Sequence, residues 1–263
     1  MPGHFAGSTA EHYRHFRRDV PDAVVDQLVD RLGLGPDATA VDVGTGTGQL
    51  AVTLARRVGT VLAIDPEPDM LALLRERIDD EGVQNLLCVL GTDRDLAVFV
   101  DVLRPGACAL VTIANALHWM DAPTVFAACS RLLTPGGAVA IVTHGVPLWL
   151  GEGEWNRALR MYLESWTGHE ATATCGSDDA ALQQRRTELT TAGFGEVCVL
   201  RHRYGAVVDA ASLIGHLYSA MPEDMVPADR RNEFETGVRR VLKPFEPGPL
   251  IEDVPVTVLL GRR

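Results

Sequence analysis

Short apolar runs of strand length alternate with longer amphipathic stretches along most of the 263-residue chain. Most runs are rich in valine, leucine and isoleucine and lack polar alternation, which is typical of strands buried on both faces of a parallel sheet. The expected strands cover residues 41–43, 61–65, 86–90, 110–113, 138–142, 197–204 and 254–260. This order of strands and helices predicts an α/β fold built on a mostly parallel sheet.

Helical spacing of apolar residues fills the intervals between these strands. A helix that begins after Pro21 and ends at Gly33 is expected to pack on the sheet, because proline and glycine mark its two ends. Further helices are expected over residues 48–58, from 68 onward, and over 121–133, 155–166, 180–192, 209–219 and 227–241. The Pro135-Gly136-Gly137 stretch is expected to end the 121–133 helix.

Three glycines follow the first strand in the pattern G-x-G-x-G, at Gly44, Gly46 and Gly48. Glycines let the backbone turn tightly and approach a ligand, and the following helix would direct its amides toward the same turn. Asp65 ends the second strand, where an acid reaches ribose hydroxyls in a βαβ unit. Because Gln49 stands where a dinucleotide fingerprint has its third glycine, the spacing favours S-adenosylmethionine over a nicotinamide cofactor. A plain loop remains the alternative.

Five motifs in the same order carry a family resemblance: residues 41–50, 65–70, 91–96, 114–119 and 132–137. The chain resembles the class I S-adenosylmethionine-dependent methyltransferases, within the small-molecule, type 11-like branch in which an A-L-H-W segment follows the fourth strand. The resemblance implies a Rossmann-like seven-stranded sheet with helices on both faces and an antiparallel last strand. It also implies methyl transfer from S-adenosyl-L-methionine to a small-molecule acceptor.

The resemblance assigns cofactor-binding positions along the chain. They are Tyr13, Asp42, Gly44, Thr45, Gly46, Gly48, Asp65, Pro66, Met70, Thr92, Asp93, Ala114 and Asn115. Tyr13 would close over the cofactor, although it could instead belong to a basic surface helix. Met70 would contact the adenine or simply fill the core, and Asp93 would accept a hydrogen bond from the adenine amino group unless Asp95 takes that role.

The acceptor is expected between the N-terminal segment and the loop after the fifth strand. The predicted substrate-binding residues are Tyr13, Arg17, His118, Trp119, His144 and Trp149. His118 is the candidate general base, or the residue that orients the acceptor, because a neutral imidazole can take a proton near physiological pH. A buried loop residue that supports Trp119 is the alternative for His118.

The predicted organisation is a single methyltransferase domain over residues 1–263. It contains an N-terminal helical segment, residues 1–35, and a lid-like insertion at about 145–180 that interrupts the alternating pattern. Insertions after the fifth strand are where related enzymes build a substrate lid.

The net charge and the composition limit the kinds of molecule that the protein is expected to bind. The formal net charge of −11 argues against a nucleic-acid substrate, as does the absence of a [DN]-P-P-[YF] loop. Five scattered cysteines are expected to be reduced, and no apolar run has membrane-spanning length, so a cytoplasmic protein is expected. His12 and His15 lack further ligands, so no metal is expected. A monomer and a homodimer remain open.

Two other functions are compatible with a cofactor-binding fold of this kind. The first is an S-adenosylmethionine-binding protein that does not methylate, such as a regulatory module or a cyclase, and the residues do not exclude it. The second is a dehydrogenase. Gln49 and the lack of a lysine, tyrosine and serine set near the fourth strand argue against the dehydrogenase.

Overall fold

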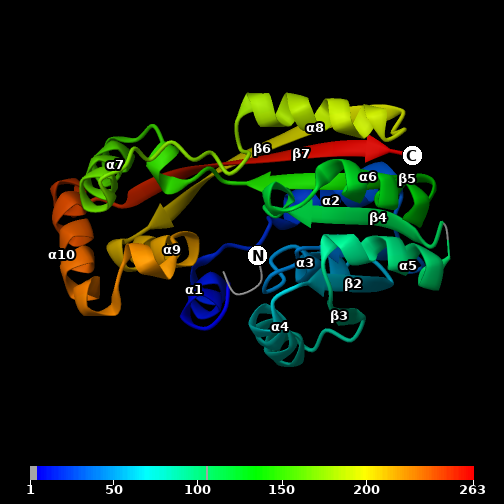
Figure 1. Cartoon of the computed structure of the whole chain (residues 1–263), viewed down its shortest axis with the longest axis horizontal. Coiled ribbons are helices and arrows are strands. Elements are labelled where there is room, and N and C mark those ends of the chain that lie inside the picture. The colour runs from blue at the N-terminus through cyan, green and yellow to red at the C-terminus, as the bar shows by residue number, and fades with distance from the viewer. Residues whose placement is uncertain (1–4, 105) are drawn as a thin grey trace.

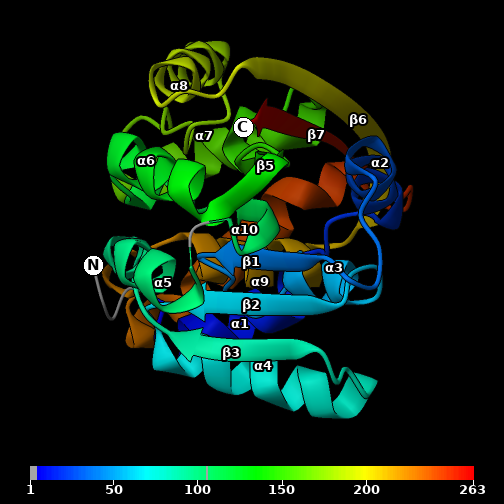
Figure 2. The ribbon, with the colours of Figure 1, turned by 90° about the vertical axis from the view of Figure 1, so that its right-hand side faces the viewer.

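The computed structural model describes residues 5–104 and 106–263 and is built on one seven-stranded sheet (Figures 1 and 2). The strand order is β3-β2-β1-β4-β5-β7-β6; β1 to β5 pair in parallel, and β7 is antiparallel to β5 and β6. The predicted fold class is therefore confirmed. The strands are β1 Thr39–Val43, β2 Thr60–Asp65, β3 Leu86–Leu90, β4 Cys108–Ala114, β5 Leu133–His144, β6 Glu196–Val208 and β7 Leu250–Arg262.

Helices cover both faces of the sheet, each over its own hydrophobic core (Figure 2). Helices α2, α3 and α4 pack on one face, and α5, α6 and α8 pack on the other. Helix α5 adds to the elements expected from the sequence. The α-helices within the described residues are α1 Ser8–Phe16, α2 Asp22–Leu32, α3 Ala51–Ala55, α4 Pro68–Glu81, α5 Leu96–Leu103, α6 Ala122–Leu132, α7 Glu154–Thr167, α8 Asp179–Thr191, α9 Ala210–Ala220 and α10 Arg231–Leu242.

A third hydrophobic cluster lies at the far end of β6 and β7, away from the rest of the sheet (Figure 1). The two strands are longer than expected from the sequence, because they continue as a ribbon in which Val208 pairs with Leu250. Helices α7, α9 and α10 pack around this ribbon, with Phe234 fully buried among them. From the 145–180 segment, α7 and the short 3₁₀ helix Leu148–Leu150 belong to this larger helical layer.

The N-terminal helix α1 is held against α9 and against the sheet helices. A Cβ added at Gly215 of α9 would lie 2.2 Å from Phe16 Cδ2, so only glycine permits this approach. Behind α1, the buried Arg77 of α4 donates two hydrogen bonds to Asp19, at 2.8 and 2.6 Å. These contacts place the polar side chains of α1 over the carboxyl ends of the strands.

Two predicted boundaries are wrong. The helix expected over 48–58 is only the short α3, which begins at Ala51 because Gly48 adopts a φ of +86° that an α-helix cannot contain, and which ends at Ala55. Helix α6 ends at Leu132, before the Pro135-Gly136-Gly137 stretch that was expected to end it. That stretch belongs to β5, which begins at Leu133 and shifts its register on β4 between Cys108 and Leu110.

No helix among the described residues is long and apolar enough to cross a membrane.

Candidate active site

The glycine turn after β1 is held in place by the end of β2. The amides of Gly44 and Thr45 both donate to the carbonyl of Ile64, at 2.8 and 3.0 Å. Gly44 has φ of +69°, and a Cβ there would lie 2.5 Å from Ala116 Cβ. The turn therefore requires glycine both for its backbone conformation and for the close approach of the loop after β4.

The Asp65 carboxylate lies beneath this turn and is only 6% exposed. It accepts hydrogen bonds from the amides of Gly46 at 2.7 Å and Glu67 at 2.9 Å. Burial raises the pKa of Asp65, and these two amide hydrogen bonds act in the opposite direction. A carboxylate has about four lone-pair sites, so Asp65 can still accept hydrogen bonds from ligand hydroxyls.

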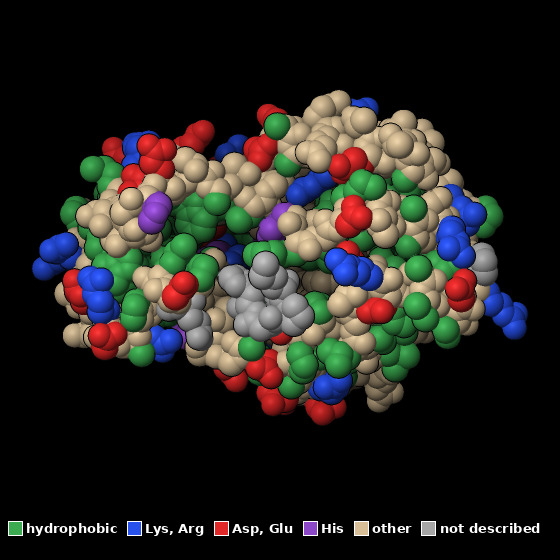
Figure 3. All heavy atoms as spheres, in the orientation of Figure 1, with side chains coloured by type: hydrophobic (Ala, Val, Ile, Leu, Met, Phe, Trp, Pro, Cys, Tyr) green, Lys and Arg blue, Asp and Glu red, His purple; other side chains and the backbone are tan. Residues whose placement is uncertain are grey.

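Two adjoining pockets open at the carboxyl ends of the strands. The first, which we call the Asp65 pocket, is lined by residues that include Gly46, Asp65, Met70, Asp93, Ala116 and Met120. The second, the Arg17 pocket, is lined by residues that include Arg17, Arg18, His118, His144, His216 and Glu252. Tyr13, Gly44, Ala114, Asn115 and Trp119 line both pockets and so mark their junction. Figure 3 shows histidine and hydrophobic side chains beside a central hollow on this face.

Asp93 and Asp95 differ in the contacts that their side chains make. Asp95 accepts hydrogen bonds from the amide and the hydroxyl of Thr92, at 2.7 and 2.9 Å, and thereby caps the short 3₁₀ helix Asp93–Asp95. Asp93 lines the Asp65 pocket, whereas Asp95 is not among its lining residues. Of the two acids left open by the sequence, Asp93 is the one placed to meet a ligand.

Asp42 is the buried acid of the Arg17 pocket, at 1% exposure. Its two carboxylate oxygens accept hydrogen bonds from the hydroxyls of Thr45 and Thr112, both at 2.6 Å. Burial raises the pKa of Asp42 to about 6. Asp42 is therefore mostly ionised at neutral pH, but burial disfavours its charged form. A cation bound next to the carboxylate would offset this desolvation penalty.

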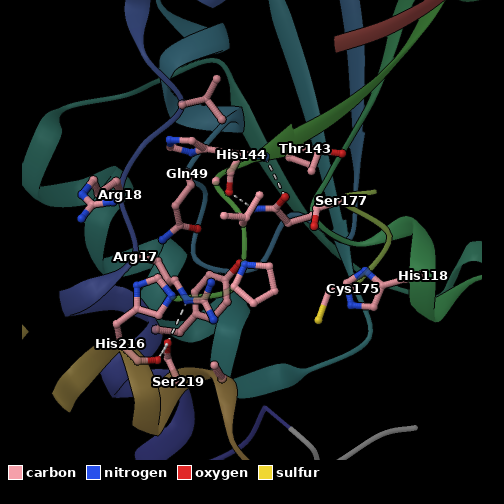
Figure 4. Close-up of a pocket in the computed structure, with 18 of the residues that line it drawn as sticks. Arg17, Arg18, Gln49, His118, Thr143, His144, Cys175, Ser177, His216 and Ser219 are labelled. Atoms are coloured by element: carbon pink, nitrogen blue, oxygen red, sulfur yellow. Dashed lines mark hydrogen bonds between the residues drawn. The ribbon is translucent and has the colours of Figure 1, made fainter. Parts of the chain in front are cut away.

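His118 lies on the short helix Leu117–Trp119 after β4. Desolvation, with smaller contributions from Arg185 and Arg17, lowers its pKa to about 4, although the ring remains open to the pocket. The imidazole is therefore neutral at pH 7, and it is a weak base. Figure 4 shows His118 beside Cys175, with Arg17, His216 and Ser219 in another part of the pocket.

His144 ends β5 and is held by both its backbone and its ring. The Asn115 side chain accepts a hydrogen bond from the His144 amide at 2.9 Å and donates one to the His144 carbonyl at 3.1 Å. The Asn115 backbone has a φ of +49°. His144 Nε2 lies 2.7 Å from the Tyr204 hydroxyl. Burial lowers the pKa of His144 to about 4, so this ring is also neutral at pH 7.

The structure brings the predicted site residues together, with one exception. Gly46, Asp65, Pro66, Met70, Thr92 and Asp93 line the Asp65 pocket; Asp42, Thr45, Arg17, His118, His144 and Trp149 line the Arg17 pocket. Gly48 lines neither pocket. A Cβ at Gly48 would lie 2.4 Å from Leu74 Cδ1, so this glycine lets α4 pack closely.

Several residues of the Arg17 pocket were missed by sequence reasoning. They are Arg18, Cys175, Ser177, His216, Ser219 and Glu252. No local pattern marks them, because His216 and Ser219 lie in an apolar helix and Glu252 lies in an alternating strand. Among the described residues, no group of three His, Cys, Asp or Glu side chains that could hold a metal ion occurs.

This strand order, with a glycine turn after β1 and an acid after β2, is that of a Rossmann-like methyltransferase fold. YcgJ of Bacillus subtilis has the same fold, with a TM-score of 0.53 at 14% identity over 92% of this chain and 99% of that one. So does phosphoethanolamine N-methyltransferase 2 of Haemonchus contortus, solved with phosphomonomethylethanolamine and S-adenosylhomocysteine. Its TM-score is 0.55 at 17% identity, over 98% of this chain and 57% of that one.

Residues 40–137 match the family model described as "Methyltransferase domain". Residues 40–137 of the chain therefore contain a methyltransferase domain. An uncharacterized methyltransferase of Mycobacterium tuberculosis is 29% identical over 136 residues, which is 52% of this chain and 50% of that protein. Methyltransferase cfoB of Aspergillus candidus is 33% identical over 114 residues, 43% of this chain and 35% of that protein. The chain thus spans about half the length, or less, of these relatives.

Proposed function

We propose that this protein transfers a methyl group from S-adenosylmethionine to a small-molecule acceptor. The observation that carries the proposal is the junction of the two pockets at the glycine turn, because it would bring a bound cofactor and an acceptor into contact. The net charge of −11 favours a small molecule over a nucleic acid.

The Asp65 pocket suits the nucleoside of the cofactor. Asp65 would accept hydrogen bonds from the ribose hydroxyls, since its remaining lone pairs face the pocket beside Gly46. Met70 and Met120 supply apolar contact for a purine ring, and Asp93 would accept a hydrogen bond from its amino group. The lining thus combines apolar surface with a few polar groups, as small-molecule sites usually do.

Asp42 and Tyr13 suit the amino-acid end of the cofactor. Asp42 is a buried carboxylate that would be stabilised by a ligand ammonium group, and it lies two residues before Gly44. Tyr13 lines both pockets, and its ring lies 3.5 Å from the position of a Cβ at Gly46. Tyr13 would therefore cover the junction from the side of α1.

The lid-like role of residues 145–180 has support from their place in the Arg17 pocket. Gly145 to Trp149, together with Thr174, Cys175 and Ser177, line that pocket. Trp149 Nε1 donates to the carbonyl of Ala173 at 3.1 Å, which ties the two ends of the segment together. We propose that this segment covers the acceptor within one methyltransferase domain. Residues 1–4 of that predicted domain and of its helical segment 1–35 lie outside the described residues.

Bound S-adenosylmethionine supplies a sulfonium-activated methyl group, and the acceptor's electron pair forms the new bond while the pair of the S–CH₃ bond stays on sulfur. The protein's contribution is to hold the reactants in line and to exclude water. His118 is proposed to orient the acceptor, because an imidazole with a pKa of about 4 is too weak a base to deprotonate a phenol or alcohol readily.

Cofactor binding is tested by calorimetry with S-adenosylhomocysteine and with NADH. We expect S-adenosylhomocysteine to bind and NADH to show no heat of binding. Methyl transfer is then followed by mass spectrometry with labelled S-adenosylmethionine and a panel of amines, phenols and carboxylates. Binding without transfer to any acceptor would favour a non-methylating, cofactor-binding protein, and tight NADH binding alone would contradict the proposal.

Replacing His118 with glutamine should lower turnover less than about 10-fold, because an orienting hydrogen bond can be kept by the amide. The dependence of turnover on pH between 6 and 9 should stay the same in both proteins, since His118 is already neutral throughout that range. Turnover at saturating cofactor, with thermal stability recorded in parallel, is the measurement. A loss of roughly 100-fold or more in a stably folded variant would instead indicate general-base catalysis.

A further inference from the structure

His144 lines the Arg17 pocket and is fixed in place at the end of β5. The Asn115 side chain holds its backbone through hydrogen bonds with both the amide and the carbonyl. Its ring Nε2 lies 2.7 Å from the hydroxyl of Tyr204, which belongs to β6 and is not among the residues that line the pocket. Figure 4 shows His144 and His118 in different parts of the pocket wall. Within the described residues Nδ1 of His144 has no hydrogen-bond partner, so this nitrogen remains for a ligand.

The direction of the hydrogen bond between Tyr204 and His144 follows from their surroundings. Burial raises the pKa of Tyr204, although the positive charge of the nearby Arg18 opposes this shift, so the phenol keeps its proton at pH 7. The cation favours the orientation in which the hydroxyl oxygen faces Arg18 and the O–H points away from it. Arg18 is itself held by a 2.5 Å hydrogen bond to Glu252 and has no lone pair to accept the proton. Tyr204 therefore donates to Nε2 of His144.

This hydrogen bond selects one tautomer of the His144 ring. Burial, with smaller contributions from Arg18 and Arg17, lowers the pKa of His144 to about 4, so the ring carries a single proton at pH 7. A neutral imidazole has one donor nitrogen and one acceptor nitrogen. Because Nε2 accepts from Tyr204, the proton lies on Nδ1. His144 therefore presents an N–H group, and no lone pair, to a ligand in the pocket.

The charged side chains that line the Arg17 pocket cancel one another. In the described part of the chain they are Arg17, Arg18, Asp42 and Glu252. Asp42 counts as charged because its pKa of about 6 lies below neutral pH. The histidines of the lining add no charge, since burial lowers the pKa values of His118 and His144 to about 4 and that of His216 well below its usual range. The lining thus carries no net charge that would attract an ionic acceptor.

We propose that the acceptor is an uncharged small molecule whose carbonyl or ether oxygen accepts a hydrogen bond from His144 Nδ1. This inference rests on the proposed function and names its substrate class. Such an oxygen has lone pairs and no proton, so it matches an N–H group that cannot accept. A ligand group that only donates would leave two donors unpaired away from water, which is costly. Tyr204 acts as a positioning residue, since it contacts the imidazole and not the ligand.

The first test determines the tautomer of His144 in the ligand-free protein. Heteronuclear NMR of protein labelled at its histidine nitrogens distinguishes a protonated ring nitrogen from an unprotonated one by chemical shift, and His144→Phe identifies the signals of this residue. We expect a protonated Nδ1 and an unprotonated Nε2 at pH 7. Tyr204→Phe should shift the ring towards the Nε2–H form, because the donor to Nε2 is lost. A protonated Nε2 in the unmodified protein would overturn the proposal.

Tyr162→Phe is the matched control for Tyr204→Phe. The Tyr162 hydroxyl also donates one hydrogen bond, to the carbonyl of Phe234 at 3.0 Å, but it lies in the helical layer and does not line the pocket. This variant should therefore leave the His144 signals unchanged. An equal change in both variants would show that the tautomer follows a general loosening of the fold, and the role given to Tyr204 would be wrong.

The second test measures binding to the full-length protein saturated with S-adenosylhomocysteine, with acetophenone and its isostere α-methylstyrene as probes. The alkene has the shape of the ketone but no oxygen, so the ratio of the two affinities reports the hydrogen bond. In His144→Phe the preference for the ketone should fall about 5-fold, the net contribution of a neutral hydrogen bond. An unchanged ratio, or no binding of either probe to the unmodified protein, would contradict the proposal.

Two further variants and one further probe complete this test. His144→Gln, whose amide restores an N–H donor, should keep most of the preference for the ketone. Tyr204→Phe, which leaves His144 in place, should lower the preference in part and serves if His144→Phe does not fold. Benzoate should bind no more tightly than acetophenone, because the lining carries no net charge. Tighter binding of benzoate would show that the acceptor class is ionic and not uncharged.

Failure of the proposed function is distinguishable from failure of this inference. If the unmodified protein does not bind S-adenosylhomocysteine, the proposed function is wrong, and the assignment of an acceptor falls with it whatever the tautomer of His144. If S-adenosylhomocysteine binds but Nδ1 of His144 is unprotonated, the proposed function stands and this inference alone is wrong.

Discussion

Replacing Gly44 with alanine is expected to destabilise the fold by about 2 to 5 kcal/mol and to weaken S-adenosylhomocysteine binding at least about 10-fold. The backbone cost of φ +69° for an L-residue is about 1 to 2 kcal/mol. The new Cβ would lie 2.5 Å from Ala116 Cβ and 2.9 Å from Met120 Cε, and overpacking of this kind costs about 1 to 3 kcal/mol. Ala116 and Met120 both line the Asp65 pocket, so a shift that relieves the clash deforms it.

Gly33→Ala provides the matched control for this prediction. Gly33 has nearly the same φ, +63°, but a Cβ there would meet nothing within 4 Å. It should therefore show the backbone cost alone, about 1 to 2 kcal/mol, with unchanged affinity for S-adenosylhomocysteine. Denaturant unfolding and calorimetry measure the two effects. If both variants unfold alike and bind alike, the close approach of Ala116 to the glycine turn has no energetic consequence.

Replacing Asp42 with asparagine should stabilise the protein at pH 7.5 by up to about 3 kcal/mol while weakening cofactor binding. Burial raises the pKa of Asp42 from 3.8 to about 6, and a tenfold change in proton affinity between the unfolded and folded states corresponds to about 1.4 kcal/mol. Asparagine removes the buried charge and can still form hydrogen bonds with the hydroxyls of Thr45 and Thr112. Affinity should fall because the proposed partner of the cofactor ammonium is lost.

The direction of this pKa change sets the pH range of the effect. The folded protein binds a proton at Asp42 that the unfolded chain releases, so the associated stability is complete below about pH 4 and lost as the pH rises through about 6. The advantage of Asp42→Asn should therefore be absent at pH 4 and largest above pH 7. Thermal unfolding across that range is the measurement, with the exposed Asp101→Asn as control. A variant less stable than the unmodified protein at pH 7.5 would show that the carboxylate stabilises the fold.

The order of buried strands and the need for glycine at position 44 were determined by the sequence alone. Both depend on consecutive residues: short apolar runs rich in β-branched residues favour strands buried in a sheet, and a glycine-rich turn permits φ values that side chains disfavour. The strand ends then placed Asp65 and the loop after β4 at one edge, which is why most predicted cofactor positions meet in the structure.

Tertiary contacts decided the structural role of individual residues within those motifs. Gly48 has the same spacing as its neighbours but serves the packing of Leu74, which comes from a helix the motif does not include. The sequence does not distinguish Asp93 from Asp95 as the acid that would contact the adenine. In the structure they differ because Asp95 accepts hydrogen bonds from the amide and the hydroxyl of Thr92. The position of a residue in a motif specifies its backbone path, whereas its side-chain partners come from elements outside the motif.

The part of the Arg17 pocket that comes from α9 and β7 was decided only by the tertiary structure. Arg17 meets Ser219 from 202 residues away, and Arg18 meets Glu252 from 234 residues away. No periodicity links such positions, because α9 and the outer ends of β6 and β7 are held at the site by a separate hydrophobic core that contains Phe234. The residues proposed to bind the cofactor lie in local motifs, whereas part of the pocket proposed to hold the acceptor is assembled by long-range packing.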